Sequence, residues 1–442
     1  MSINVRGDLD PGLTGAFEGR STSCRRSWRY LSGWLVAAGA YYILRLLLYA
    51  TQDAREPPVI LTDKYNLSIY TVRFPFFRIY IVNDTGLSPA LPREWPTVSF
   101  NAVTANVGGV CGMSKKGPGI MNRDLASDED LDEKNGRAAE VLVEGMAEQR
   151  DRAIGKEKGP LRVGMREWVR ELMIEATTEA VYGSKNPTFE DIFLSFIAFP
   201  SAMRHKEASE LVRRNYEHFT KWGVNIDGIS RIPDVFWVLY PIFSDERALS
   251  DIRDELEALV HDYEEKGSSV RKIDIAGIRC SCPILLRTFQ ETLRYRSYLS
   301  GPRLVLEDVR LDSGSAGYLL KKGSLLMIPT TVQHNSVEAW GDDKRQDRTA
   351  YRPWGGGHTL CPGRHFASTE IMMLAALAVL RFDVVPATAT AKWTEHACDR
   401  TPSGATFPAP NEDVLVELRP RDVDKGRTWR VTYSGSDAPL AF

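Results

Sequence analysis

The segment of this 442-residue chain best suited to chemistry surrounds Cys361. Residues 354–363 read WGGGHTLCPG, and a long apolar stretch follows them at once. Glycines lack a Cβ, so a backbone rich in them can turn sharply and lie close to a flat ligand. Cys361 stands where the next helix is expected to begin, and there unpaired N–H groups and the positive end of the helix dipole favour thiolate over thiol. The pattern therefore predicts a thiolate ligand for a large, planar metal cofactor.

Two other interpretations of the cysteine loop stay open at this point. Buried cysteines without a chemical role are common in protein cores, so Cys361 could be purely structural. His358, Cys361 and His365 could also supply three ligands to zinc. The loop offers neither a nearby fourth ligand nor the Cys-x-x-Cys spacing that is typical of zinc sites.

A second pattern lies upstream of the loop, where residues 282–296 read CPILLRTFQETLRYR. Pro283 suits the first turn of a helix. Glu291 and Arg294 are three residues apart, so they share one face of that helix and can form an ion pair. By itself such a pair is usually exposed and contributes little to stability. The helical period is followed by Leu286, Phe289, Leu293 and Arg296.

In this order the two patterns resemble the cytochrome P450 superfamily. The haem loop of that family reads aromatic-x-x-Gly-x-x-x-Cys-x-Gly, and its positions are filled here by Trp354, Gly357, Cys361 and Gly363. The resemblance runs continuously through residues 283–382. It implies a haem b cofactor whose iron takes Cys361 as its axial ligand, and a thiolate in that position favours O–O cleavage.

The resemblance also implies roles for other residues near the loop. Glu291 and Arg294 match the family's Glu-x-x-Arg motif, a buried pair that braces the haem-side core, and breaking a buried pair costs about 3–5 kcal/mol. Arg303 lies where the family often places a basic residue that binds a haem propionate. His358 is a weaker propionate candidate, because the family's basic residue falls one position later, and a loop-bracing role fits it equally well.

The fold implied by the resemblance is mainly α-helical with a minor β region, preceded by a transmembrane helix. The implied activity is that of a fungal-type microsomal haem-thiolate monooxygenase. Such an enzyme takes two electrons from NADPH through a partner reductase, with cytochrome b5 as a further candidate donor. The expected substrate is a lipophilic small molecule of secondary metabolism, such as a terpenoid, steroid or polyketide.

The composition is that of an ordinary globular protein, with 43% hydrophobic and 26% charged residues. A net charge of −2 gives no reason to expect a nucleic-acid partner. The six cysteines have no regular spacing. They therefore predict a reducing compartment rather than a disulfide framework.

An apolar stretch at residues 30–50 is long enough to span a bilayer. Its one charge, Arg45, lies near an end, where the side chain can reach the interface. A buried core helix is the alternative interpretation. We expect residues 1–29 to be a polar segment, 30–50 a single-pass anchor in the endoplasmic reticulum, and 51–442 a shortened catalytic domain facing the cytosol.

The charge bias around this span conflicts with the orientation that the family implies. Basic residues before a span favour an N-terminus in the cytosol, whereas the family places the catalytic domain there. The basic residues concerned are Arg20, Arg25, Arg26 and Arg29.

Periodicity predicts the elements that surround these motifs. Residues 67–74 and 77–83 read as strands, and residues 318–329 as a hairpin around a Lys-Gly turn. The acidic run at residues 128–133 indicates a solvated helix start or loop. A fully buried helix is expected from Phe366 to Leu380. Two further helices are predicted by the stripes Trp168, Leu172, Ala176 and Ala180, closed by Gly183, and Leu249, Ile252, Leu256 and Leu259, between Asp245 and Gly267.

Three segments depart from the family pattern. Ile60 leads almost directly to Lys64, where a first helix usually stands. Residues 225–237 replace the family's long helix over the haem, but they contain no Thr, and glycine and proline there argue against a continuous long helix. The family's Pro-x-Arg-Phe segment is missing and residues 342–348 stand in its place, so the third partner of the Glu-x-x-Arg pair has no clear match. The candidates are Asp227, Ser230 and Asp234 for proton delivery, and Arg345 and Arg348 for the third partner.

Two further functions fit these departures. One is a haem-thiolate isomerase or dehydratase that does not activate oxygen. The other is an inactive, shortened family member that acts as a non-catalytic membrane-anchored protein.

Overall fold

The computed structural model describes parts of the chain between residues 67 and 433. All of these parts belong to one unit, Tyr65–Phe442. The expected anchor at residues 30–50 and the polar segment before it lie outside the described residues. Of the helices that the structure describes, none is both long and apolar enough to cross a bilayer. The described ranges are 67–74, 77–87, 96–103, 128–155, 161–182, 232–298, 301–313, 316–340, 350–356, 360–361, 363–387, 392–394, 397–399, 407–424 and 426–433.

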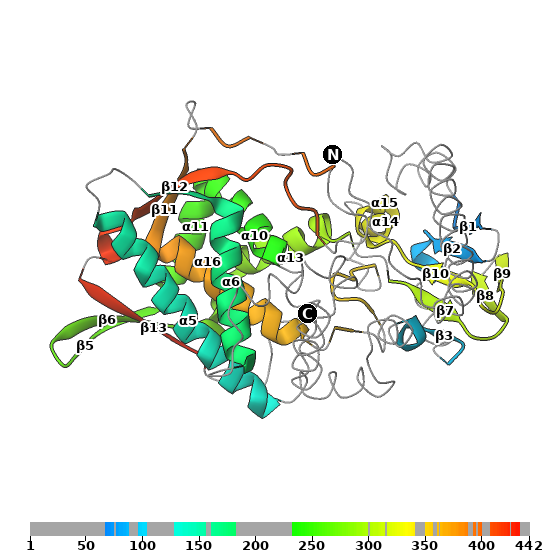
Figure 1. Ribbon diagram of the computed structural model, residues 1–442, viewed down its shortest axis with the longest axis horizontal. Coiled ribbons are helices and arrows are strands. Elements are labelled where there is room, and N and C mark those ends of the chain that lie inside the picture. The colour runs from blue at the N-terminus through cyan, green and yellow to red at the C-terminus, as the bar shows by residue number, and fades with distance from the viewer. Residues whose placement is uncertain are drawn as a thin grey trace, which may run out of the picture. The chain divides into compact units, whose positions relative to one another are not determined.

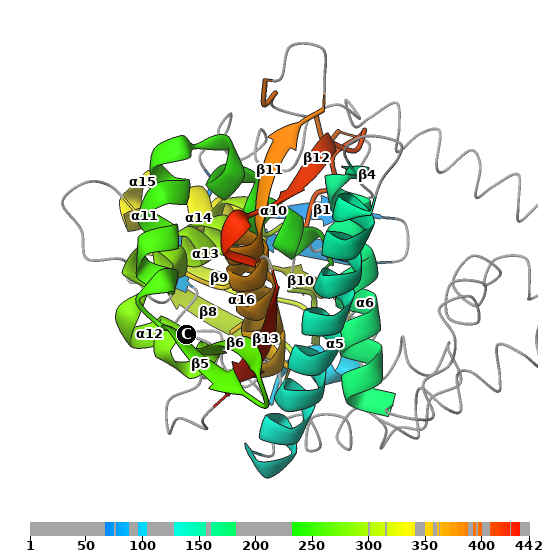
Figure 2. The ribbon, with the colours of Figure 1, turned by 90° about the vertical axis from the view of Figure 1, so that its left-hand side faces the viewer.

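Helix α16 (Arg364–Arg381) lies in the middle of a group of helices (Figures 1 and 2). Its side chains are buried at every position from Ser368 to Arg381. This confirms the prediction of a fully buried helix after the cysteine loop, because an all-round apolar helix must be covered on every face. The helices that contact α16 are α5 (Asp128–Ile154), α6 (Met165–Tyr182), α10 (Ile232–Ser244) and α11 (Glu246–Glu257), and α13 (Pro283–Arg296) packs against α10 and α11.

The apolar stripe predicted for α6 faces the core. The N-terminus of α6 is capped from a distant part of the chain, since the Asp413 carboxylate accepts the N–H groups of Arg166 and Glu167 at 2.8 and 3.0 Å. The acidic run at residues 128–133 begins α5, where its charge suits the positive end of the helix dipole. The buried stripe residues of α6 are Trp168, Leu172, Ala176 and Ala180.

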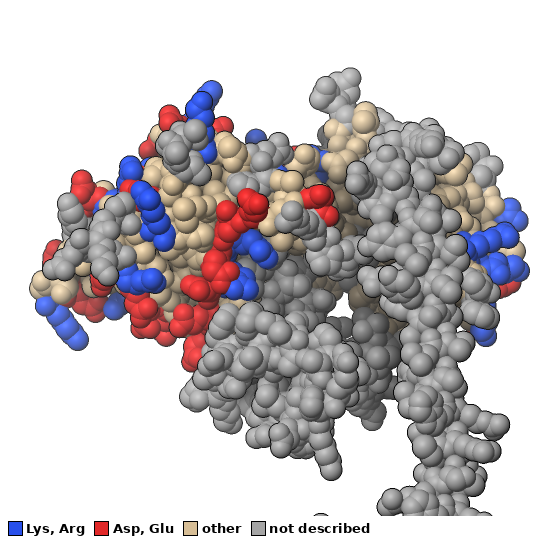
Figure 3. All heavy atoms as spheres, turned by 45° about the horizontal axis from the view of Figure 1, so that its top comes forward, with Lys and Arg blue, Asp and Glu red and all other residues tan. Residues whose placement is uncertain are grey.

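Acidic side chains gather on the outer faces of α5 and α6. Burial, together with repulsion from the other carboxylates, raises the pKa of Glu175. Figure 3 shows a stripe of acidic side chains on the helical part of the face that it draws. Such a surface attracts cations rather than anions. The carboxylates that act on Glu175 are Glu148, Glu179, Glu144 and Glu171.

Helix α10 contains two prolines and still forms. Pro233 lies in its first turn, where the missing N–H would have no helical partner anyway. Pro241 lies in its last turn, and its carbonyl accepts the N–H of Asp245 at 3.2 Å. The described part of this region is thus a 13-residue helix that begins at Ile232. Residues 225–231 lie outside the described residues.

The helix predicted between Asp245 and Gly267 is shorter than expected. Asp245 caps α11, and its carboxylate accepts two backbone N–H groups at 3.0 Å. The helix ends at Glu257 rather than extending through Leu259. The prediction was wrong at this end because Leu259, although at helical spacing, lies in the turn that follows the helix.

A hairpin of strands β5 (Val260–Glu265) and β6 (Ser268–Asp274) occupies the rest of that segment. Lys266 and Gly267 have φ values of 51° and 78°, and two positive values in succession are typical of the type I′ turn that joins tight two-residue hairpins. Strand β13 (Arg427–Thr432) adds to β6 in parallel.

A five-stranded sheet, in the order β1-β2-β10-β7-β3, forms the other part of the described structure (Figure 1). The two predicted strands near residue 70 are present as the antiparallel pair β1–β2. Strand β10 runs parallel to β2 and antiparallel to β7. The bounds are β1 (Ile69–Arg73), β2 (Arg78–Val82), β3 (Val98–Ser99), β7 (Arg303–Val305) and β10 (Leu325–Met327).

The hairpin predicted over residues 318–329 is absent. Strand β9 (Ala316–Leu320) pairs with β8 (Val309–Ser313), whereas β10 pairs with β2 and β7. The turn between β9 and β10 does form, with Gly323 at φ 75°, and the Gly323 N–H donates to Val305 at 2.8 Å. This bond directs the chain to β7 instead of back along β9, so the apolar runs on either side of the turn join different sheets.

The remaining elements complete the frame. A third sheet has the order β11-β12-β4. Helix α14 packs against α13 and so connects the sheet region to the helical core. The bounds are β4 (Leu161–Gly164), β11 (Phe382–Pro386), β12 (Leu415–Pro420), α12 (Ile278–Ser281), α14 (Thr330–Asn335), α15 (Val337–Trp340), and the 3-10 helices Thr85–Leu87, Ile275–Gly277 and Asp422–Asp424.

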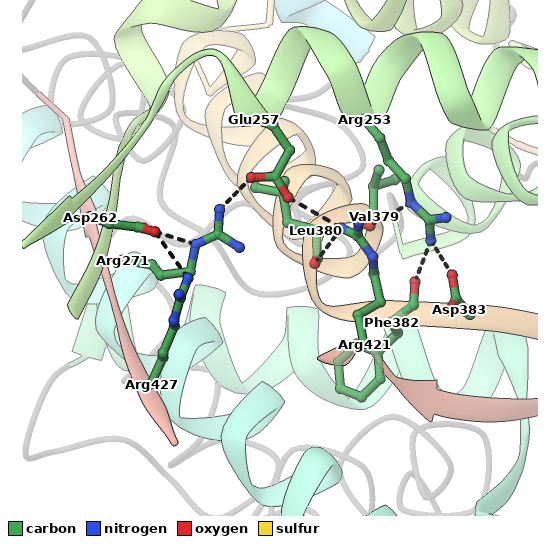
Figure 4. Close-up of polar contacts among 10 residues, drawn as sticks. All are labelled: Arg253, Glu257, Asp262, Arg271, Val379, Leu380, Phe382, Asp383, Arg421 and Arg427. Atoms are coloured by element: carbon green, nitrogen blue, oxygen red, sulfur yellow. Dashed lines mark hydrogen bonds and ion pairs between the residues drawn. The ribbon is translucent and has the colours of Figure 1, made fainter. Parts of the chain in front are cut away.

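Guanidinium groups hold the C-terminal end of α16 (Figure 4). Arg253 of α11 donates to the carbonyls of Val379 and Phe382 at 3.2 and 2.9 Å. Arg421 donates to the carbonyl of Leu380 at 2.9 Å. The last carbonyls of a helix lack helical partners and carry the negative end of the dipole, so cationic donors stabilise this end.

Glu370 is a carboxyl group buried inside the helical core. Its side chain is 2% exposed, and the Thr177 hydroxyl of α6 donates to one of its oxygens at 3.1 Å. The other oxygen has no hydrogen-bond partner among the described residues. Burial raises the pKa of Glu370 well above its usual range, and the bond from Thr177 only partly opposes this.

We expect Glu370→Gln to stabilise the protein at alkaline pH. A carboxyl whose pKa is higher in the folded state binds a proton on folding, so its contribution to stability falls as pH rises above the unfolded value of about 4.3. The neutral amide removes this dependence and can still accept from Thr177. Chemical denaturation at pH 5 and pH 8 should show a larger gain at pH 8. The control is Glu140→Gln on the exposed face of α5, which changes the net charge equally; an equal gain in both variants would contradict the expectation.

Candidate functional site

Cys361 lies directly before α16, as its sequence context predicts. Its N–H donates to the carbonyl of Trp354 at 2.9 Å, which closes the loop on itself. Its own carbonyl accepts both the backbone N–H of Arg364 at 3.3 Å and the Arg364 guanidinium at 3.1 Å. The half-buried side chain packs against the core cluster that contains α16. The sulfur is therefore carried on a segment whose backbone is fixed on both sides.

The start of the loop is a tight turn. The N–H of Gly355 donates to the carbonyl of Arg352 at 3.1 Å, and Gly355 has a φ of 87°, where a side chain would strain the backbone. Trp354 is 2% exposed and forms part of the core. Gly363 is the N-cap of α16. Gly357 and His358 lie outside the described residues.

Two arginines form a cationic site next to this turn. Arg303, on strand β7, is 7% exposed. Burial and, to a smaller extent, the positive charge of Arg352 lower its pKa to about 10. A second guanidinium close to a buried one is costly unless an anion balances the charge, and carboxylates pair well with guanidinium groups.

Glu291 and Arg294 form the ion pair that their spacing predicts. The Arg294 Nε donates to the two carboxylate oxygens at 3.0 and 2.9 Å, and this hydrogen bond raises the pKa of Arg294. The two partners differ in burial, since the side chain of Arg294 is 17% exposed and that of Glu291 is 59% exposed. The expectation of a fully buried pair is therefore wrong for Glu291, whose carboxylate stays hydrated.

Arg294 has further partners in the described residues. Its guanidinium donates to the carbonyl of His334 and lies 5.1 Å from the ring centre of Trp340, a cation–π distance. Arg345 and Arg348, the expected third partners, lie outside the described residues.

His334 is a buried residue that sequence reasoning did not single out. It has no exposed surface, and its ring nitrogens lie 2.8 Å from the carbonyl of Arg294 and 2.7 Å from the backbone nitrogen of Arg352. Burial lowers the pKa of His334 to about 4. A single histidine on a short helix gives no sequence signal, because its partners are backbone atoms of two other segments.

The other candidate residues are not brought to this site by the described structure. No group of three His, Cys, Asp or Glu side chains is placed to hold a metal ion in the described part of the chain. The zinc interpretation thus has no described support, although His358 falls outside that part. Asp227 and Ser230 also fall outside it, and the side chain of Asp234 is not described.

Known proteins similar to this chain place it in a class. The family model of cytochrome P450 matches residues 232–398. The heme domain of cytochrome P450DA has the same fold, with a TM-score of 0.60 over 86% of this chain and 95% of that one, at 15% identity. The described structure is thus a mostly helical P450 fold with minor sheets.

The relatives in sequence are P450 enzymes by name. Cytochrome P450 monooxygenase nodJ of Hypoxylon pulicicidum is 27% identical, and the alignment covers 86% of this chain and 88% of the relative. A cytochrome P450 monooxygenase of Gibberella zeae is 29% identical over 54% of this chain and 58% of the relative. By its family-model match, its relatives and its fold, this chain resembles the cytochrome P450 superfamily, whose cofactor is haem b.

The residues present fit a haem. The partly buried Cys361 can offer its sulfur to an iron. The buried Arg303 beside Arg352 supplies the positive charge that two propionates require. These residues lie on two segments, strand β7 and the loop before α16.

The unequal burial of Glu291 and Arg294 leads to an asymmetric prediction. Glu291→Ala should lower the free energy of unfolding by less than about 1 kcal/mol, because an exposed partner contributes little. Arg294→Ala should lower it by about 1–3 kcal/mol, because it removes the donor from the His334 carbonyl and uncovers Trp340. Urea denaturation of both variants and the wild type measures this. Equal losses in the two variants would show that the ion pair itself is the dominant contribution.

Proposed function

We propose that this chain is a haem-thiolate monooxygenase that hydroxylates or oxidises a lipophilic small molecule. The observation that carries the proposal is the placement of Cys361, just before a buried helix and hydrogen-bonded to the turn that begins at Arg352. The match to the family model and the names of the fungal relatives support the same activity. Haem, when bound, supplies the activation of oxygen.

The residues of this chain take distinct parts in the proposal. Cys361 would hold the iron through its sulfur. Arg303 and Arg352 would hold the propionates and so fix the rotation of the ring. Trp354 would cover the loop side of the site and exclude water there. His358 stays a candidate for a propionate or for bracing the loop.

Electron supply is proposed from the general behaviour of the family. P450 enzymes generally receive electrons from partner reductases and act on lipophilic substrates. We propose an NADPH-dependent cytochrome reductase for this chain, with cytochrome b5 as a second donor.

A terpenoid, steroid or polyketide of secondary metabolism is the proposed substrate class. A human relative named 7-alpha-hydroxycholest-4-en-3-one 12-alpha-hydroxylase is 28% identical over 34% of this chain and 35% of its own length. Its name describes oxidation of a rigid, polycyclic lipid. Such a substrate would suit an enzyme held at a membrane, and we propose anchoring to the endoplasmic reticulum through residues 30–50, with the catalytic domain in the cytosol.

The sulfur–iron bond is the first step to test. The full chain, reduced and exposed to carbon monoxide, should show the red-shifted Soret band of thiolate-ligated haem. Cys361→Ala should abolish that band, while Cys398→Ala should retain it. Cys398 is a matched control because its side chain is also half-buried and packs against the same core cluster. A band that survives in Cys361→Ala, or is absent from folded wild-type protein, would refute the ligand assignment.

The proposed oxygen chemistry needs a second measurement. With a P450 reductase present, a monooxygenase should consume NADPH and oxygen in parallel when its substrate is added. An isomerase or dehydratase would convert substrate without consuming either.

A further inference from the structure

We propose that His334 is a positioning residue, which sets the place of the Cys361 loop by joining it to the end of helix α13. One imidazole ring makes this connection through its two nitrogens. The inference rests on the proposed function, because it concerns the loop that would present Cys361 to the haem.

The partners of the ring fix its chemical form. The backbone N–H of Arg352 can only donate, so Nε2 of His334 accepts this bond at 2.7 Å. The carbonyl of Arg294 can only accept, so Nδ1 of His334 donates to it at 2.8 Å. The ring is therefore neutral, with its proton on Nδ1. In this form each nitrogen is matched to one backbone group.

On the α13 side, His334 and Arg294 are joined by two hydrogen bonds in opposite directions. While His334 donates to the carbonyl of Arg294, the guanidinium of Arg294 donates to the carbonyl of His334. The two residues thus exchange hydrogen bonds between α13 and α14. The position of the ring relative to α13 is held twice, and α13 in turn packs against α10 and α11 of the helical core.

The connection leads directly to the cysteine on the other side. Arg352, which His334 holds, is the first residue of the turn that Gly355 closes. Trp354, inside that turn, accepts the N–H of Cys361 at 2.9 Å. A displacement at Arg352 would therefore be passed to Cys361 through one short turn, and it would also move the charge that faces Arg303.

The surroundings keep the ring in place and neutral. Tyr351 stacks on it with ring centres 5.7 Å apart and planes 22° apart, and Trp340 meets it edge-on at 6.5 Å. The charged groups that act on it are those of Arg294, Arg352 and Glu291. Two of the three are positive, so they disfavour a second proton on the ring, as burial also does.

The test compares His334 with a neighbouring residue that is equally buried but is hydrogen-bonded to a different segment of the chain. His334→Phe keeps an aromatic ring in the stack and deletes both hydrogen bonds. Gln333→Leu is the matched control: Gln333 is also fully buried on α14, but its amide donates to the carbonyl of Asn83 at 2.9 Å, away from the loop. His334→Gln, which retains one donor and one acceptor, should lie between Phe and wild type.

Two readouts separate positioning from packing. The fraction of haem with the thiolate carbon monoxide band should fall at least about tenfold in His334→Phe and less than about twofold in Gln333→Leu. Hydrogen exchange of the backbone amides in residues 350–356, followed by mass spectrometry, should be faster only in His334→Phe. Equal effects in the two variants would reduce His334 to a packing residue and overturn the proposal.

The wild-type protein provides a test that needs no variant to fold. The amide of Arg352 should exchange slowly in both the haem-free and the haem-bound protein, because the ring holds it without the cofactor. Rapid exchange of this amide would overturn the proposal. Failure of the haem-ligand assignment would be recognised separately, by a thiolate band that persists in Cys361→Ala while the amide remains protected.

Discussion

The burial of α16 on all sides is the constraint on which the rest of the described structure depends. A helix with no exposed stripe cannot rotate or slide without losing apolar contacts, and well-packed interiors resist such shifts. Its far end is held by Arg253 and Arg421, which occupy the last carbonyls (Figure 4). Cys361 lies just before the N-terminal end of α16, so the packing of this helix in the core, and not the loop alone, fixes the position of the sulfur.

Positive charge is concentrated around the segment that precedes this helix. The guanidinium groups of Arg294 and Arg352 act on the ring of His334, and that of Arg352 also acts on Arg303. Their environments differ. Arg294 pairs with the carboxylate of Glu291, and the positive charge of Arg352 acts on the buried Arg303. An arrangement that lowers the pKa of an arginine is unfavourable in isolation, and a dianionic ligand would convert this cost into binding free energy.

Local periodicity was sufficient for the elements whose partners are close in sequence or whose pattern is long. The stripe of α6, the pair β1–β2 and the burial of α16 followed from it. Local periodicity failed where a strand pairs with a partner far away in the sequence. The apolar runs on either side of Gly323 suggested one hairpin, but β10 pairs with β2 and β7. It also failed past Glu257, where the hairpin β5–β6 is stabilised by β13 from more than 150 residues later. Pairing partners at that separation leave no trace in a local pattern.

The candidate site also contains residues that the sequence pattern predicted and residues that it could not predict. Motif spacing singled out Cys361 and the pair Glu291–Arg294, and the family resemblance added Arg303. The structure confirms the ion pair, while the haem roles of Cys361 and Arg303 stay predictions. Motif spacing could not locate His334, since that residue acts on backbone atoms, and any residue type can supply a carbonyl or an N–H. Nor could it show that Glu291 is hydrated while Arg294 is covered. The motif predicts that Glu291 and Arg294 pair. The contacts with α14 and Trp340 decide that Arg294 contributes more to stability than Glu291.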